Sequence, residues 1–258
     1  MPNGKKPRVL VTNDDGYDAA GLRALAEELK DFAEVHIVAP SWERSGAAQS
    51  LTIRQPIVCH RITENEWAID GTPVDCVIVA LHKLLNEPPD LVISGINQGA
   101  NLGENVYYSG TVGAAREAVI HHVPGLAVSL CSKRVNSDFA PSARLARETA
   151  ELILREKLPE QVFLNVNVPE SWNGGVKFTR QSGKITRTVL REGEDPRGVR
   201  YFWLSEERLG REMDLDAESD YAAIFAGEVS ITPLHLDPTD TESLNHLSHW
   251  AKKLANRG

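Results

Sequence analysis

"PRVLVTNDDGYDAAGLRALAEELKDFAEVHIVAP", residues 7–40, is the stretch of sequence that decides the fold. Its two ends, 7–13 and 34–40, are short apolar runs rich in β-branched residues, which is typical of buried strands. Between them, over 21–33, leucine and alanine recur at helical spacing with charged residues in the gaps. The order strand, helix, strand predicts a βαβ unit whose two strands are parallel.

The same alternation continues along the chain. Further strands are predicted at 90–95, 125–130 and 162–169, and further helices at 72–86, 111–122 and 141–157. Strands that alternate with helices predict an α/β fold with a mostly parallel sheet covered on both faces. In such folds ligands bind beyond the carboxyl ends of the strands.

The pattern changes near residue 175. Pieces such as 199–205 and 227–235 are strand-like, but long charged connections separate them and no clear helix is visible before 230. We interpret this region as hairpins and as a candidate oligomer contact, followed by an amphipathic helix at 240–255. The prediction is a single domain over 1–258 with three parts: an α/β core at 1–175, a β-rich extension at 176–235 and a C-terminal helix within 236–258.

Composition limits the classes of partner. The chain has 258 residues, 41% hydrophobic and 25% charged, which is ordinary globular composition. No signal peptide or long apolar run is present, and three scattered cysteines favour reduced thiols, so we expect a cytoplasmic protein without a membrane partner. The net charge of −8 disfavours a stable nucleic-acid complex. A small anionic substrate would need a local positive site.

Two adjacent aspartates, Asp14 and Asp15, follow the first predicted strand. At about 4 Å two carboxylates repel by about 4 kcal/mol when the effective dielectric constant is near 20. Gly16 permits a positive φ, which would turn the chain so that both side chains point to one place. Paired carboxylates suit Mg²⁺, Mn²⁺ or Ca²⁺. A solvated turn is the alternative interpretation, and the position after a strand favours the metal site.

The segment "SGINQGANLGENVYYSGTVGAARE", residues 94–117, is the most informative one. A long glycine-rich loop inside a compact domain is usually functional. The next helix is expected to begin near Ser109, where unpaired N–H groups and the Ser109 and Thr111 hydroxyls would form a phosphate cradle. These hydroxyls are equally suited to cap the helix, and the two roles are compatible. Asn97 and Asn101 offer uncharged groups suited to metal or phosphoryl oxygens.

Several motifs of other enzyme classes are missing. The loop does not end in the GK[ST] of a P-loop, residues 17–22 do not match a dinucleotide fingerprint, and neither GxSxG nor HExxH occurs. The loop "APSWERSGAAQSLT", residues 39–52, is small and polar, and from its residues alone we interpret it as an ordinary surface loop.

Taken together, these stretches resemble the SurE family, the stationary-phase survival proteins that act as metal-dependent 5'-nucleotidases. The matching stretches are "TNDDG", "VAPSWERSGAAQSLT", "GTPVDC", "DLVISGINQGANLGENVYYSGTVGAAREA" and "GEVSITPLH", which extend to about residue 235. The resemblance implies a Rossmann-like three-layer core with a C-terminal β-hairpin extension, assembled as a homodimer or homotetramer. The segments around 134–148 and 206–220 look individual to this chain.

The resemblance also implies residue roles. Asp14 and Asp15 match paired catalytic metal ligands, Ser45 a serine ligand and Asn97 an asparagine ligand. Asn13, Asn101, Ser109, Gly110 and Thr111 match positions that would contact the substrate. One divalent ion per subunit is implied, most simply Mg²⁺ or Mn²⁺ and alternatively Ca²⁺. The implied reaction is hydrolysis of a nucleoside 5'-monophosphate by metal-activated water, with the amides at 109–111 holding phosphoryl oxygens.

Three other functions remain open at this point. A receiver-like signalling module also has an acidic pair after its first strand, but it needs a further Asp where this chain has "SGINQG". An aspartyl-phosphate phosphatase needs Asp-x-Asp, whereas here the aspartates are adjacent. A nucleotide-binding or regulatory protein without turnover fits the same fold, because one fold serves many functions.

Overall fold

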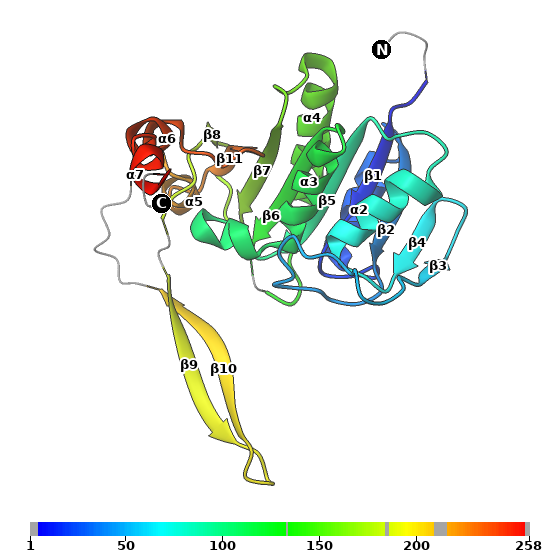
Figure 1. Cartoon of the computed structure of the whole chain (residues 1–258). Coiled ribbons are helices and arrows are strands. Elements are labelled where there is room, and N and C mark those ends of the chain that lie inside the picture. Colours follow the sequence, from blue (N-terminus) through cyan, green and yellow to red (C-terminus); the bar gives the residue numbers. More distant parts are fainter. Residues whose placement is uncertain (1–4, 133, 184–185, 209–215, 256–258) are drawn as a thin grey trace.

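A nine-stranded sheet forms the centre of the computed structural model, which describes residues 5–132, 134–183, 186–208 and 216–255 (Figure 1). The strand order is β3-β4-β2-β1-β5-β6-β7-β11-β8. The bounds are β1 Arg8–Thr12, β2 Glu34–Pro40, β3 Cys59–Arg61, β4 Glu66–Ile69, β5 Leu91–Gln98, β6 Gly125–Cys131, β7 Val162–Pro169, β8 Val176–Phe178 and β11 Val229–His235. The predicted α/β class is confirmed.

The order of strands reverses beside β1. This strand pairs in parallel with β2 on one side and with β5 on the other, because the chain runs outward through β2 and β4 and then returns to β5. In open α/β sheets ligands bind at such a reversal, beyond the carboxyl ends of the two diverging strands. The residues that follow β1 and β5 therefore occupy the favoured position for a site.

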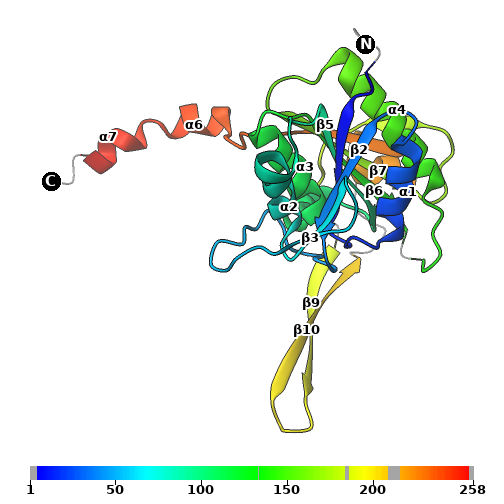
Figure 2. The same cartoon turned by 90° about the vertical axis from the view of Figure 1, so that its right-hand side faces the viewer.

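Helices cover both faces of the sheet (Figure 2). One face carries α1 (Ala20–Leu29) and α4 (Ala140–Glu156), and the other carries α2 (Pro73–Val79) and α3 (Gly110–Ile120). Val9 and Val11 pack in the cluster that contains α1 and α4, whereas Leu10 packs with α2 and α3. Successive side chains of a strand face opposite sides, so a strand buried on both faces needs the continuous apolar run seen in the sequence.

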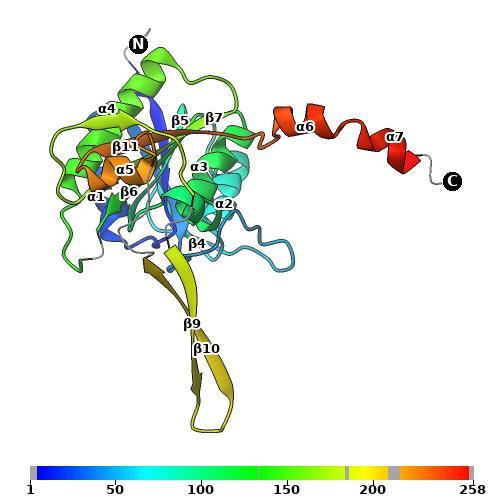
Figure 3. The ribbon, with the colours of Figure 1, turned by 90° about the vertical axis from the view of Figure 1, so that its left-hand side faces the viewer.

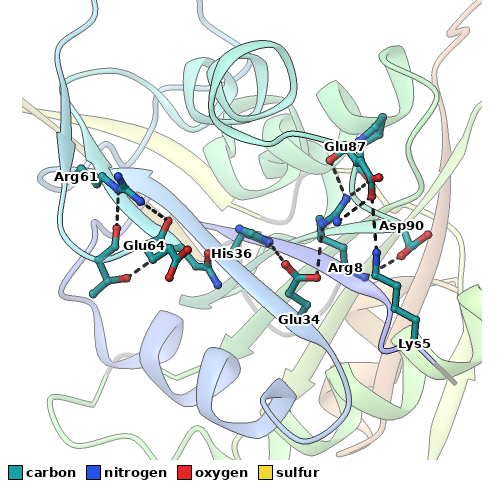
Figure 4. A network of polar contacts seen from close by, with 11 residues as sticks. Lys5, Arg8, Glu34, His36, Arg61, Glu64, Glu87 and Asp90 are labelled. Carbon is teal, nitrogen blue, oxygen red and sulfur yellow. Dashed lines mark hydrogen bonds and ion pairs between the residues drawn. The ribbon is translucent and has the colours of Figure 1, made fainter.

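Charged side chains pair with one another at the amino-terminal end of β1, the end opposite to the aspartate turn (Figure 4). The Arg8 guanidinium lies 3.0 Å from the Glu87 carboxylate and 3.8 Å from that of Glu34. The backbone N–H of Arg8 donates to Asp90 Oδ2 at 2.8 Å. Opposite charges therefore compensate each other at the amino-terminal end of β1. Asp14 lies at the other end of the strand, where the described residues provide it with no ion pair.

The region after residue 175 differs in part from the prediction. Within the described residues of this region, β9 (Thr186–Glu194) and β10 (Arg200–Arg208) form the one hairpin that projects away from the body (Figures 1 and 3). β8 and β11 lie in the main sheet, where β11 is antiparallel to β7, so the sheet extends past the boundary at 175. A short helix, α5 (Asp220–Phe225), lies where no helix was expected. Its six residues are too few for a helical period to be recognised in the sequence.

The chain ends in an arm that leaves the body (Figures 2 and 3). It holds two short helices, α6 (Thr241–Leu247) and α7 (Trp250–Ala255), instead of the one helix predicted at 240–255. Residues 256–258 of the predicted C-terminal part lie outside the described residues. In the described part of α6 and α7 no residue is buried. Across the described residues, no helix has the length and apolar character needed to cross a membrane.

Candidate functional site

A tight turn places two aspartates at the end of β1. The Asn13 side chain holds this turn, because its Nδ2 donates to the Gly16 carbonyl at 2.9 Å and its Oδ1 accepts from the Gly16 N–H at 3.3 Å. Gly16 has a φ of +103°, and a Cβ there would lie 3.1 Å from the Trp42 carbonyl carbon. Glycine therefore meets both demands of the turn, the backbone angle and the close approach of the following loop.

The two carboxylates are unevenly buried. Asp14 is 4% exposed, and its Oδ1 accepts a 2.5 Å hydrogen bond from the Thr111 hydroxyl. Burial raises the pKa of Asp14 despite the opposing effect of this bond. Burial, and secondly the charge of Asp14, raise the pKa of Asp15 to about 6. Within the described residues neither aspartate has an ion-pair partner at 4 Å or less, so this carboxylate pair lacks a compensating cation from the protein.

Helix α3 begins directly against Asp14. The Ser109 hydroxyl caps the helix by accepting from the Val112 N–H at 3.1 Å, as expected. A Cβ on Gly110 would lie 2.9 Å from the Cβ of Asp14, so only glycine allows this approach. Hydrogen bonds from the backbone of Thr111 and Gly110 act to lower the pKa of Asp14. The positive end of α3 is therefore directed at the first aspartate.

A pocket of about 550 Å³ opens beside these groups. It is lined by Asp14, Ser45, Gly46, Asn97, Gln98, Ala100, Asn101, Asn105, Tyr108, Ser109, Thr188 and Leu204. A second pocket of about 430 Å³ is lined by Asp15 and shares Ser45 and Gln98 with the first. Ser45 thus lines both the pocket that contains Asp14 and the pocket that contains Asp15. These volumes are in the range of ordinary small-molecule sites.

The residues around the pair fit a hard divalent cation. Within the described residues no group of three or more His, Cys, Asp or Glu side chains could hold a metal, so a cation here would combine two carboxylates with neutral oxygen donors. Asn97 Nδ2 donates to the Gly99 carbonyl at 2.8 Å, which orients the amide in the pocket wall. The Ser45 hydroxyl donates to Glu43 Oε1 at 2.8 Å. Oxygen donors of this kind suit Mg²⁺, Mn²⁺ or Ca²⁺.

A buried asparagine network supports the loop after β5. Asn101 N–H donates to Asn167 Oδ1 at 2.8 Å, and the Asn101 carbonyl accepts from Asn165 and Asn167 at 2.8 and 3.1 Å. The Asn101 amide donates to the Ser129 hydroxyl at 2.9 Å. The backbone N–H and carbonyl of Asn101 are thereby hydrogen-bonded inside the protein. A buried polar group without a partner would lower the stability by about 1–3 kcal/mol.

The structure brings most of the predicted residues together. Asp14, Ser45, Asn97, Asn101 and Ser109 line the larger pocket, and Asp15 lines the adjoining one. The other three predicted residues do not line either pocket. Asn13 is used within its own turn, and Gly110 and Thr111 contact Asp14.

Sequence reasoning missed further residues. Gln98 lines both pockets, and its N–H donates to Asp15 Oδ2 at 3.1 Å. Asn165 and Asn167 are two residues apart in an otherwise apolar strand, so their side chains lie on the same face of the sheet. This spacing is the sequence signal for a polar contact on that face. Thr188 and Leu204 reach the pocket from the hairpin, and no sequence signal indicates that contact.

Comparison with known proteins settles the family. The model for "Survival protein SurE" matches residues 9–188. The chain belongs to the SurE family. It is 42% identical over 246 residues to the 5'-nucleotidase SurE of Geotalea daltonii, a match that covers 94% of this chain and 98% of that protein. It is 44% identical over 255 residues to the 5'-nucleotidase SurE of Vibrio parahaemolyticus, with 97% of each chain covered.

A solved SurE structure has the same fold. The crystal structure of the SurE protein from Aquifex aeolicus matches with a TM-score of 0.84 and 38% identity, and it covers 95% of this chain and 100% of its own. The predicted family and the α/β fold with a β-hairpin extension are therefore confirmed. The SurE family model ends within β9, whereas the SurE relatives match nearly the whole chain.

Proposed function

We propose that this protein is a metal-dependent 5'-nucleotidase that hydrolyses nucleoside 5'-monophosphates to nucleoside and phosphate. One observation carries the proposal: a buried and a partly buried carboxylate, Asp14 and Asp15, lie at the reversal of the sheet beside the amino end of α3, and neither has a cationic partner among the described residues. A divalent ion would neutralise the two carboxylates, and together with the positive end of α3 it would attract an anionic phosphate group. The names of relatives at 42–44% identity agree with this activity.

Four residues would hold the cation, namely Asp14, Asp15, Ser45 and Asn97. Mg²⁺ or Mn²⁺ suits two carboxylates and neutral oxygens best, and Ca²⁺ is also compatible. When bound, such an ion would supply positive charge for the phosphoryl oxygens and make a water molecule more acidic.

The remaining residues of the site would orient these groups. Thr111 fixes the Asp14 carboxylate through its 2.5 Å hydrogen bond, and we assign it this positioning role in place of substrate contact. Ser109 and Asn101 line the pocket, where they would face the phosphoryl group. Asn13 would keep the aspartate turn closed. Fixed dipoles that need not reorganise during reaction are the main source of such electrostatic stabilisation.

We also propose that the chain assembles as a homodimer or homotetramer. Large apolar side chains are exposed on the hairpin and on the terminal arm, including Trp203 at 69%, Leu204 at 71% and Leu254 at 62%. Exposed apolar side chains on segments that project from the body are often covered by another protein chain. An enzyme without a membrane or nucleic-acid partner, placed in the cytoplasm, remains our expectation.

Phosphate release from AMP tests the nucleotidase proposal. The purified protein is assayed with Mn²⁺, Mg²⁺ or Ca²⁺, and with EDTA alone, and nucleotide binding is measured in parallel. We expect release only with a divalent ion, and loss of release in Asp14→Asn. Nucleotide binding without phosphate release under all of these conditions would instead indicate a regulatory protein and contradict the proposal.

A further inference from the structure

The loop over residues 41–52 carries Ser45 but is not part of the sheet. Its first half is tied to the aspartate turn, because the Arg44 N–H donates to the Asp14 carbonyl at 2.6 Å. Its second half lies directly on α3, where a Cβ on Gly113 would lie 2.7 Å from the Ala48 carbonyl oxygen. The Ala48 N–H also donates to the Tyr108 carbonyl at 3.1 Å.

Gln49 makes the side-chain contacts that tie this loop to α3. Its Nε2 donates to Glu117 Oε2 at 2.9 Å, and its Oε1 accepts from the Arg116 guanidinium at 3.2 Å. Glu117 is 7% exposed, so the bond is protected from water. Both partners are consecutive residues of the helix whose amino end contacts Asp14.

The chemistry of the bridge fits the amide of Gln49. Glu117 offers only an acceptor and Arg116 only donors, so the group between them must donate on one side and accept on the other. A carboxylate at position 49 would face the carboxylate of Glu117, and an apolar side chain would leave both charged groups without this partner. Hydrogen bonds to charged groups are the strong ones.

We infer that Gln49 is a positioning residue that holds the Ser45 loop in register with the aspartate pair. The inference rests on the proposed function, because it assumes that Ser45 contributes to a metal site. Helix α3 then acts as a common support, with Thr111 holding Asp14 at its first turn and with Arg116 and Glu117 holding the loop about one and a half turns further along. Loss of the bridge would leave the loop held by its backbone hydrogen bonds at Arg44 and Ala48, and so would loosen Ser45 while leaving the aspartates in place.

Mn²⁺ affinity of the whole protein tests the inference, measured by titration with electron paramagnetic resonance detection of free Mn²⁺. In Gln49→Leu we expect the Mn²⁺ dissociation constant to rise about tenfold, the equivalent of one hydrogen bond to a charged group. Amide hydrogen exchange across residues 44–50 should accelerate. Gln55→Leu, the same change at an exposed position further along the chain, should leave both measurements unchanged.

A donor–acceptor exchange provides the sharper comparison. Gln49→Glu alone should weaken Mn²⁺ binding, whereas Gln49→Glu combined with Glu117→Gln restores a donor facing an acceptor and keeps the total charge, so its affinity should return to within about twofold of the original protein. A Gln49→Leu protein with unchanged Mn²⁺ affinity, or a double variant no better than Gln49→Glu, would overturn the inference alone. An unaltered protein that binds no Mn²⁺ would overturn it together with the proposed function.

Discussion

The hydroxyl of Thr111 donates a 2.5 Å hydrogen bond to Asp14 Oδ1 across 97 residues of sequence. This bond joins the turn after β1 to the first turn of α3. It acts to lower the pKa of Asp14, against the larger effect of burial. Thr111 thus helps to keep the buried carboxylate in the ionised form that a cation would need.

We predict that Thr111→Val weakens Mn²⁺ binding and AMP hydrolysis about 10- to 100-fold, because a hydrogen bond to a charged group contributes about 1.5–3 kcal/mol. The loss of the hydroxyl should also move the acidic limb of the pH–rate profile to higher pH, since the pKa of Asp14 rises. Thr111→Ser, which keeps the hydroxyl, should behave like the original protein. Equal activity of the Val and Ser variants would show that the bond has no role.

We predict that Asp15→Asn stabilises the metal-free protein at pH 8. The pKa of Asp15 is raised from 3.8 to about 6 in the folded state, so the folded protein binds this proton more tightly than the unfolded chain. Stability therefore falls as the pH rises through the window from 3.8 to about 6, and the full loss is present above that window. The charge-free variant avoids this loss.

Thermal unfolding in EDTA checks the sign of the Asp15 effect. The melting temperature of Asp15→Asn should exceed that of the original protein at pH 8, by about 2–4 °C for each kcal/mol recovered. Near pH 4 most of the difference should vanish. A variant that is less stable at pH 8 would mean that a protein group already compensates the carboxylate. AMP hydrolysis should be lost at every pH.

We predict that Mn²⁺ stabilises the protein at pH 8 and does so less below pH 6. The ion and the proton compete for Asp15, whose pKa of about 6 sets the window, and a ligand that binds only the folded state raises its stability. The shift in melting temperature on adding Mn²⁺ should therefore shrink as the pH falls through 6. A shift independent of pH, or one that persists in Asp14→Asn, would indicate binding elsewhere.

We predict that Asn167→Leu is destabilising and raises the KM for AMP. The change leaves the buried Asn101 N–H without its 2.8 Å acceptor, which costs about 1–3 kcal/mol, and loosens the loop that lines the pocket. Denaturant unfolding and steady-state kinetics measure the two effects. Asn86→Leu, at an exposed position, is the control and should change neither.

We predict that the terminal arm contributes to assembly. Leu244, Leu247, Trp250 and Leu254 are exposed at helical spacing on α6 and α7. Leu247→Glu and Trp250→Glu together should reduce the mass measured by light scattering, while Asn245→Glu should not. Little loss of fold is expected, because no described residue of either helix is buried. An unchanged mass would show that the arm does not take part in assembly.

Local pattern was sufficient for most of the core. The apolar runs of β1 and β2 and the spacing in α1 could be read directly, because strands buried on both faces and amphipathic helices have distinct periods. β3, with three exposed residues, and β8, also of three residues, carry no such period. The place of β11 beside β7 could not be predicted either, since pairing between distant strands leaves no local trace.

The sequence by itself determined which chemical groups are available: the aspartate pair, the glycine that turns the chain and the capped helix, all specified by residue type over a few neighbouring positions. The role of Ser45 in its loop came only from the resemblance to a family. Only the tertiary structure decided how these groups are used. In the folded protein Thr111 donates a hydrogen bond to Asp14, and the Asn13 amide is hydrogen-bonded within its own turn. Gln49 bonds to both Arg116 and Glu117. These outcomes depend on contacts between segments distant in the chain, and such contacts are fixed by packing of the whole core and not by local preference.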